Sequence, residues 1–235
     1  MAHENCRFGN YRYEIVVDSN MRFVCAVASA ALFACNLAGL AESKVTCDQT
    51  LTAPLRTGAL LVIDSRPAGL EIVGTDLETI HVTCHGGDNE DAAPHILLQF
   101  SPNPDGGRLK IEGSHMRHGN NLQVKIEVPW KTNLRVQMPA GEVKVEEIKG
   151  DKDIELYAGQ ITISSAHEWN YRSVNASVTI GEVRAAAYNA DKGGFFRSFN
   201  KKTTDGEYRF HAHVMTGEID LLGKKARTDG ASGPD

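Results

Sequence analysis

Apolar and polar residues alternate on both sides of four glycines, and the alternation changes phase at each glycine. The apolar residues stand three and five positions before the glycine and two and four positions after it: Val136, Met138, Val143 and Val145 around Gly141; Ile154, Leu156, Ile161 and Ile163 around Gly159; Ala176, Val178, Val183 and Ala185 around Gly181; Ala212, Val214, Ile219 and Leu221 around Gly217. A period of two predicts half-buried strands, and the change of phase predicts a turn at the glycine, which adopts positive φ easily. Each unit is therefore predicted to be two short strands with an apolar inner side.

The repetition of this unit predicts an architecture. Successive glycines are 18, 22 and 36 residues apart, and repeats of about 20 to 50 residues are typical of solenoids, propellers and arrays. We predict an all-β fold in which residues 131–222 form successive coils of a right-handed β-solenoid, a β-helix-like stack of short strands sharing one core. The longest gap holds either a degenerate unit or a long insertion. The alternative is a β-sandwich with four unrelated hairpin turns.

Longer alternating runs occupy residues 55–130, separated by Gly, Pro, Asn and Asp. Within them, Leu60–Ile63 and Leu70–Gly74 bracket a turn and form an earlier copy of the unit in a shifted register. We expect a small antiparallel sheet of paired strands in front of the solenoid. Residues 42–222 are then a single β-rich domain, and the tail 223–235, which has no apolar periodicity, is predicted to be disordered.

The N-terminal part of the chain has the pattern of a secretory signal. Met21-Arg22 precedes an alanine-rich apolar stretch from Phe23 to Ala41 that ends in small residues. We interpret residues 21–41 as a signal peptide behind a polar extension, 1–20, and expect an exported protein of the periplasm, the cell surface or the extracellular space. One alternative is a membrane anchor formed by residues 23–41. Another is acylation of Cys35.

Removal of residues 1–41 leaves two cysteines, Cys47 and Cys84. Disulfides form in exported proteins, so one bond between these two residues is possible. The alternative is two free thiols that never meet.

Charge and motifs exclude several classes of function. The chain has 235 residues and a net charge of −5, with Lys and Arg paired only at 201–202 and 224–225. That distribution argues against nucleic-acid binding. The nucleophile elbow, the phosphate loop and the metalloprotease motif are missing, so we predict a protein that is not an enzyme and has no cofactor. The alternative is a carbohydrate-active enzyme on a β-helical scaffold, with carboxylates across a groove.

Two surfaces are candidates for binding. The first is the run 193–202, where Phe195, Phe196, Arg197 and Phe199 combine aromatic and basic groups that are common in binding contacts. Its simpler interpretation is that the phenylalanines cover the end of the core. The second is the outward column after the glycines, with Glu142, Gln160, Glu182 and Glu218 beside Lys144, Thr162, Arg184 and Asp220. Stacking would make it a flat polar face with an acidic bias.

Histidines and acidic loops give no convincing metal site. His211 and His213 project from the same face of a strand, but the other pairs, His81 with His85 and His115 with His118, have no reason to lie near them. We interpret all of them as surface histidines. The acidic loop 86–91 lacks the ordered spacing of a calcium loop and is interpreted as a solvated turn.

Three strings, Ala140–Val145, Gly150–Leu156 and Thr216–Leu221, resemble the bacterial putative-adhesin family, whose members are domains of unknown function. The resemblance covers about residues 60–222, and its motif is a structural repeat. It implies an exported β-solenoid at the cell envelope that presents a binding or scaffolding surface. The partner would be an envelope protein, a glycan or a lipid headgroup, with the membrane reached only through the signal or an anchor.

Overall fold

β-Strands run along most of the described part of the chain, which comprises residues 42–66, 69–85, 96–113, 122–164 and 171–222 of this computed structural model. The strands and one 3-10 turn are β1 (Ser43–Thr46), β2 (Leu51–Pro54), β3 (Leu60–Ser65), β4 (Gly69–Thr75), β5 (Thr79–His85), β6 (Ile96–Asn103), β7 (Gly106–Gly113), β8 (Gln123–Pro129), β9 (Asn133–Glu146), β10 (Lys152–Ile163), β11 (Tyr171–Ala185), η2 (Ala186–Tyr188), β12 (Ala190–Lys202) and β13 (Tyr208–Leu221). All thirteen strands join one mixed sheet, so the predicted all-β class is confirmed.

Several predictions fall outside these residues. All described residues belong to one compact unit. The predicted extension and signal, the anchor at 23–41, Cys35, the loop 86–91, His115 with His118 and the tail 223–235 are not described. The domain limits, 42 and 222, therefore remain predictions. In the described ranges, no helix has the length and apolar character needed to cross a membrane.

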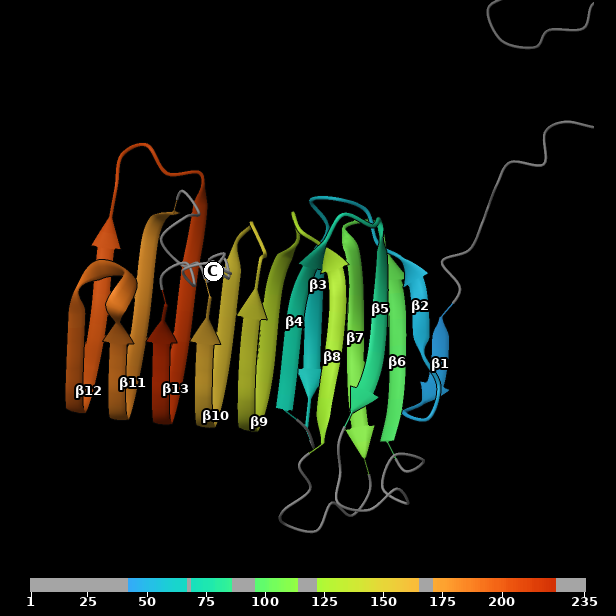
Figure 1. Cartoon of the computed structure of the whole chain (residues 1–235), viewed down its shortest axis with the longest axis horizontal. Coiled ribbons are helices and arrows are strands. Elements are labelled where there is room, and N and C mark those ends of the chain that lie inside the picture. Colours follow the sequence, from blue (N-terminus) through green and yellow to red (C-terminus); the bar gives the residue numbers. More distant parts are fainter. Residues whose placement is uncertain (1–41, 67–68, 86–95, 114–121, 165–170, 223–235) are drawn as a thin grey trace, which may run out of the picture. The chain divides into compact units, whose positions relative to one another are not determined.

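Each predicted strand–glycine–strand unit is one long strand bent at its glycine. The four corner glycines have φ angles of 133°, 135°, 139° and 145°. Strands β9, β10, β13 and β11 pair in parallel so that Gly141 lies beside Gly159, Gly159 beside Gly217, and Gly217 beside Gly181. Figure 1 shows these strands folding back along the lower edge of the view, with one half of each strand behind the other.

The order of the strands in space differs from the expected succession of coils. The path through the sheet is β9-β10-β13-β11-β12, so the last unit of the sequence lies between the second and the third. The long gap between Gly181 and Gly217 contains η2 and β12, and β12 pairs antiparallel with β11. The gap therefore holds an insertion that makes a hairpin and not a degenerate parallel coil.

The region before residue 131 continues the same arrangement. β3 pairs in parallel with the first half of β9, and β4 pairs in parallel with its second half, as an interrupted copy of the unit should. β7 pairs in parallel with β3, and β8 pairs in parallel with β4. Beyond them, β6 pairs antiparallel with β7, and β5 pairs antiparallel with β8. The expected separate antiparallel sheet is thus corrected, because most of this region adds parallel strands to the two halves that β9 begins.

The predicted inner positions form the core. All sixteen apolar side chains that define the repeat are at most 4% exposed, and they belong to one hydrophobic cluster together with residues of β3 to β8. Side chains from the first and second halves of the bent strands therefore meet in a common interior. The alternation in the sequence therefore predicted correctly which side chains point into the core.

The structure joins Cys47 and Cys84 in a disulfide, with their Cα atoms 5.5 Å apart. Cys47 follows β1 and is buried, and Cys84 lies on β5. The bond therefore ties the start of the described chain to a strand 37 residues further on.

Loss of this disulfide should destabilise the fold. Closing a loop of this length restricts the unfolded chain, and such a bond contributes about 4 kcal/mol. We expect dithiothreitol to lower the free energy of unfolding of the wild type by about that amount, measured in urea. The Cys47→Ala/Cys84→Ala variant should match the reduced wild type and should not respond to dithiothreitol. Equal stability of the oxidised and reduced wild type would contradict this role.

Candidate binding surface at the glycine corner

Large apolar side chains are exposed along the line where the strands bend. Tyr157 and Met215 stand two positions before their corner glycines, and Ile180 stands one position before its glycine. They are 64%, 38% and 46% exposed, and Phe195 and Phe196 of β12 are 68% and 81% exposed. We call these five residues the corner ridge. Among the described residues only Leu77, Trp130 and Leu222 are other large apolar side chains with comparable exposure, so the exposure is concentrated at the corner.

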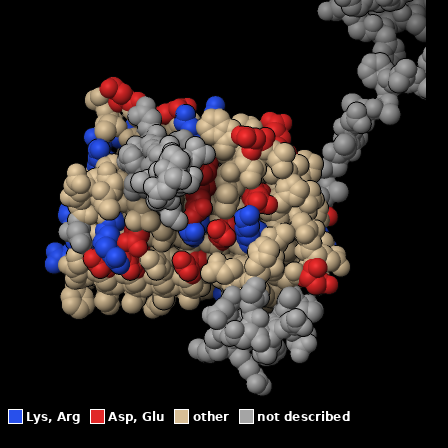
Figure 2. All heavy atoms as spheres, in the orientation of Figure 1, with Lys and Arg blue, Asp and Glu red and all other residues tan. Residues whose placement is uncertain are grey.

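The corner ridge is continuous from strand to strand. β10, β13, β11 and β12 are neighbours in this order, and Ile180 is paired directly with Phe195. Neighbouring strands lie about 4.8 Å apart, so the ridge extends over about 15 Å. In the orientation of Figure 1, Figure 2 shows uncharged side chains along the left part of the lower edge, below β12 to β9, and charged side chains above them. The ridge is thus an apolar border beside a charged surface.

The phenylalanines of β12 divide into two groups. Phe199 packs against the core and stacks on Tyr188, with ring centroids 5.2 Å apart. Phe195 and Phe196 do not cover the core, so the simpler interpretation of this run holds only for Phe199. Arg197 is exposed next to them, and its Nε donates to the carbonyl oxygen of Gly193 over 2.6 Å.

Phe196 is held outward by its backbone. Its φ is 52°, in the left-handed region, which costs a non-glycine residue about 1 kcal/mol. Such conformations persist only where the surrounding structure imposes them, and they are concentrated at functional sites. Here the surrounding structure is the pairing of β12 with β11 on both sides of Phe196.

The predicted polar face lies on the outer side of the second halves of the strands. The register places Glu142, Gln160, Glu218 and Glu182 side by side in this order. Arg184 lies 3.5 Å from Glu182 and 3.3 Å from Asp220, and it also contacts Glu218. Arg184 therefore pairs with three carboxylates of the face, one of which, Asp220, is only 8% exposed. The face still has four carboxylates against two cations, Lys144 and Arg184.

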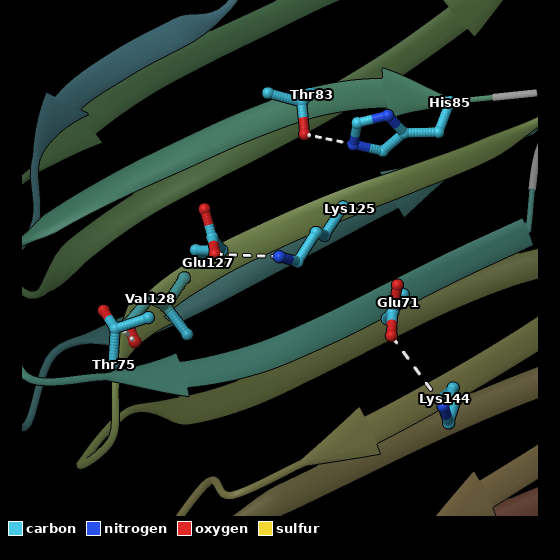
Figure 3. A network of polar contacts seen from close by, with 8 residues as sticks. All are labelled: Glu71, Thr75, Thr83, His85, Lys125, Glu127, Val128 and Lys144. Atoms are coloured by element: carbon cyan, nitrogen blue, oxygen red, sulfur yellow. Dashed lines mark hydrogen bonds and ion pairs between the residues drawn. The ribbon is translucent and has the colours of Figure 1, made fainter.

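The polar face continues over β9, β4, β8 and β5 with alternating charges. Figure 3 shows Lys144 facing Glu71, Lys125 bonded to Glu127, and Thr83 bonded to His85. The hydrogen bond to Glu146 is the main reason that the pKa of Lys144 is raised, and the bond to Glu127 raises the pKa of Lys125. These cations are thus matched locally by carboxylates, and such exposed ion pairs contribute little to stability.

Lys152 is buried in the interior at the start of β10, 2% exposed. Its Nζ donates to the carbonyl oxygens of Ile148 and Gly150, at 2.7 and 3.3 Å, and to the Tyr171 hydroxyl at 2.6 Å. Burial lowers the pKa of Lys152 to about 7, because the ammonium loses its hydration. Lys152 stands seven positions before Gly159 and so extends the inward alternation by one step, but a lysine at that position gives no apolar signal in the sequence.

The histidines have separate surroundings. His81 is hydrogen-bonded to Thr52, and His213 is bonded through Nδ1 to the Ser177 hydroxyl at 3.0 Å. His211 lies beside Asp153 in the β10–β13 register, and Asp153, Glu155 and His211 bring their possible metal-ligating atoms within 4.8 Å of one another. The sequence offered no third ligand for His211, and the structure supplies two carboxylates from the neighbouring strand.

Comparisons with known proteins give distant likenesses. No protein-family model and no curated protein matches the chain. A solved putative cell adhesion protein from Clostridium sporogenes is similar at 12% identity with a TM-score of 0.41, over 75% of this chain and 99% of that one. A putative adhesin from Parabacteroides distasonis is similar at 11% identity with a TM-score of 0.24, over 49% of this chain and 56% of that one. A putative lipid binding protein from the same organism is similar at 10% identity with a TM-score of 0.20, over 75% and 96%.

Proposed function

We propose that the protein is a non-catalytic, exported cell-envelope protein, an adhesin-like β-solenoid whose corner ridge binds a partner protein. The observation that carries the proposal is the continuous exposure of Tyr157, Met215, Ile180, Phe195 and Phe196 along the bend of four adjacent strands. Contiguous apolar patches on soluble proteins mark sites of interaction.

The composition of the corner ridge favours a protein as the partner. Aromatic residues, methionine and arginine are enriched in protein interfaces, and Tyr and Arg are common among the residues that contribute most to binding. The ridge contains three aromatic side chains and one methionine, and exposed Arg197 adjoins it. The polar face provides a hydrophilic border, which is the usual rim of such an interface.

Export is supported by two features of the chain. Residues 21–41 have the sequence pattern of a secretory signal. The disulfide between Cys47 and Cys84 suits an oxidising compartment. The periplasm, the cell surface and the extracellular space all meet these conditions.

The test is the binding of the purified chain to isolated envelope fractions. We expect Phe195→Ser/Phe196→Ser to bind at least about tenfold more weakly than the wild type, since truncation of central interface aromatics costs about 2 kcal/mol or more. The control is Leu77→Ser/Leu222→Ser, which removes two exposed leucines, 57% and 39% exposed, that do not belong to the ridge. It should bind like the wild type. Both variants change exposed residues, so their thermal melts should remain close to that of the wild type.

Treatment of the envelope fraction identifies the class of partner. Protease treatment should abolish binding if the ridge contacts a protein. Binding that survives protease but is lost after glycosidase treatment or lipid extraction would replace the protein with a glycan or a lipid. Equal binding by the wild type and the Phe195→Ser/Phe196→Ser variant would refute the corner ridge as the site.

A further inference from the structure

A histidine and two carboxylates converge on the outer side of the first halves of the strands. Asp153 and Glu155 are two residues apart on β10 and so project from the same side of the strand. His211 of β13 is paired with Asp153 in the parallel register. The ligating atoms of these three residues all lie within 4.8 Å of one another.

We propose that Asp153, Glu155 and His211 bind a divalent transition-metal ion, of which Zn²⁺ is the best fit. Imidazole nitrogen and carboxylate oxygen are both common zinc ligands, at about 2.0 to 2.2 Å, so the ligands of a tetrahedral site are about 3.4 Å apart. The possible ligand atoms lie within 4.8 Å of one another, so binding an ion requires them to move closer together. A site of pure carboxylates would favour Mg²⁺ or Ca²⁺, and the imidazole shifts the preference toward zinc.

The backbone that carries the three ligands is fixed on both sides. β10 is paired with β9 and β13, and β13 is also paired with β11. The inward neighbours of the ligands, Ile154 and Ala212, are fully buried. Ligands mounted on rigid, paired strands lose little freedom when they bind an ion, which favours a preorganised site.

The contacts of the three side chains with neighbouring charged groups leave them free to bind a metal ion. Arg135 lies 3.2 Å from Asp153, through its Nε and the Oδ2 oxygen. Asp153 can keep this contact and coordinate through its other oxygen, as carboxylate ligands with an outer hydrogen-bond partner do. Within the described part of the chain, neither the Glu155 carboxylate nor the His211 imidazole makes a hydrogen bond or an ion pair. The site therefore has two uncommitted ligands and one oriented ligand.

Space for a further ligand adjoins the cluster. Asp153 and His211, together with Arg135 and Arg209, line a hollow of about 520 Å³. Three protein ligands with an open position leave room for water or for an anionic group of another molecule. The two arginines would favour the anionic group. The inference is independent of the corner ridge and goes beyond the proposed function.

Titration of the full chain with zinc chloride, followed by calorimetry, tests the site. We expect His211→Ala and Glu155→Gln each to weaken the binding of one zinc ion at least about tenfold, since each removes a direct ligand and loss of even an outer partner costs about 10- to 100-fold. The matched control is His213→Ala. It removes a histidine from the same strand and the same face, but one that is bonded to Ser177 and lies outside the cluster.

Zinc should also raise the melting temperature of the wild type and of His213→Ala, because an ion that binds the folded state stabilises it. The shift should shrink in His211→Ala and Glu155→Gln, whose melts without zinc should match the wild type. Three results would overturn the site: no zinc binding by the wild type, unchanged binding in His211→Ala or Glu155→Gln, or an equal loss in His213→Ala.

Discussion

Replacing Gly159 with alanine should destabilise the protein by more than 4 kcal/mol, or prevent folding. Gly159 has a φ of 135°, and a Cβ placed on it would lie 1.8 Å from the carbonyl oxygen and 2.8 Å from the carbonyl carbon of Gly141. These are backbone atoms of β9, which is held in register with β10 along its whole length. They can move only by breaking the pairing at the corner, and losses above about 4 kcal/mol are typical of such forced disruption.

The same close approach recurs along the stack. A Cβ on Gly217 would lie 1.8 Å from the oxygen of Gly159, and a Cβ on Gly181 would lie 1.8 Å from the oxygen of Gly217. Gly159, Gly181 and Gly217 therefore each serve two purposes, since they permit the positive φ of the bend and leave room for the neighbouring strand.

Gly58→Ala separates these two purposes. Gly58 also has positive φ, 82°, but nothing lies within 4 Å of a Cβ placed there. The Gly58→Ala variant should therefore lose only about 1 kcal/mol of its free energy of unfolding, from the strained backbone conformation. Urea unfolding of both variants measures the difference. A Gly159→Ala variant within 1 kcal/mol of Gly58→Ala would mean that the stacked corner relaxes around a methyl group.

The pattern of buried positions around the glycines could be predicted because it depends only on residues close by in the sequence. Burial of Val143, Ile161, Val183 and Ile219 follows from alternation within a few residues of each glycine, and no knowledge of neighbours is needed. The bend also follows, since the phase of the alternation changes there. These features predict the buried positions of β9, β10, β11 and β13 on both sides of each glycine.

The order of the strands could not be predicted from the same frame. All four units have the same alternation and the same glycine, so any unit fits beside any other in the same parallel register. The choice that places β13 between β10 and β11 depends on the hairpin of β11 and β12. That hairpin turns through η2 and Asn189, which has a φ of 55°. No repeat signal marks this turn in the sequence.

Recognition of the metal cluster also requires the order of the strands in the sheet. Asp153 and His211 are neighbours only because β10 pairs with β13, so a sequence separation of 58 residues concealed the cluster. Three residues of the corner ridge could have been predicted to be exposed from the sequence. Tyr157, Ile180 and Met215 stand between the two alternating halves, at positions that the inward pattern does not include. Only the outward direction of Phe195 and Phe196 required the structure, because β12 lacks the repeat.

Between pH 7 and pH 9, the free energy of unfolding should rise by about 2 kcal/mol through Lys152. This ammonium lies inside the sheet, in register with Leu134 and Phe210, and its hydrogen-bond partners are two carbonyls and a phenol. Burial lowers the pKa of Lys152 from 10.5 to about 7, against a smaller opposing effect of Asp151. In the unfolded chain the group keeps its ordinary pKa.

The sign follows from the protons bound in each state. Above pH 7 the folded protein holds Lys152 neutral, whereas the unfolded chain keeps it protonated up to about pH 10.4. The unfolded state therefore binds more protons in this window, and stability rises with pH by at most about 1.4 kcal/mol per pH unit. Tyr171 does not interfere below pH 9, because burial raises its pKa.

Lys152→Met should remove this pH dependence. Methionine fills a similar apolar volume without an ionisable group, so its free energy of unfolding should change by less than about 0.5 kcal/mol between pH 7 and pH 9, measured by urea unfolding at several pH values. Lys131→Met, at an exposed lysine, is the control and should keep the wild-type slope. The slope is the decisive quantity, since the absolute stability of Lys152→Met also includes the loss of three hydrogen bonds. If the wild type and Lys152→Met have equal slopes, Lys152 remains charged in the folded protein, and its three oxygen acceptors compensate for the burial of the ammonium.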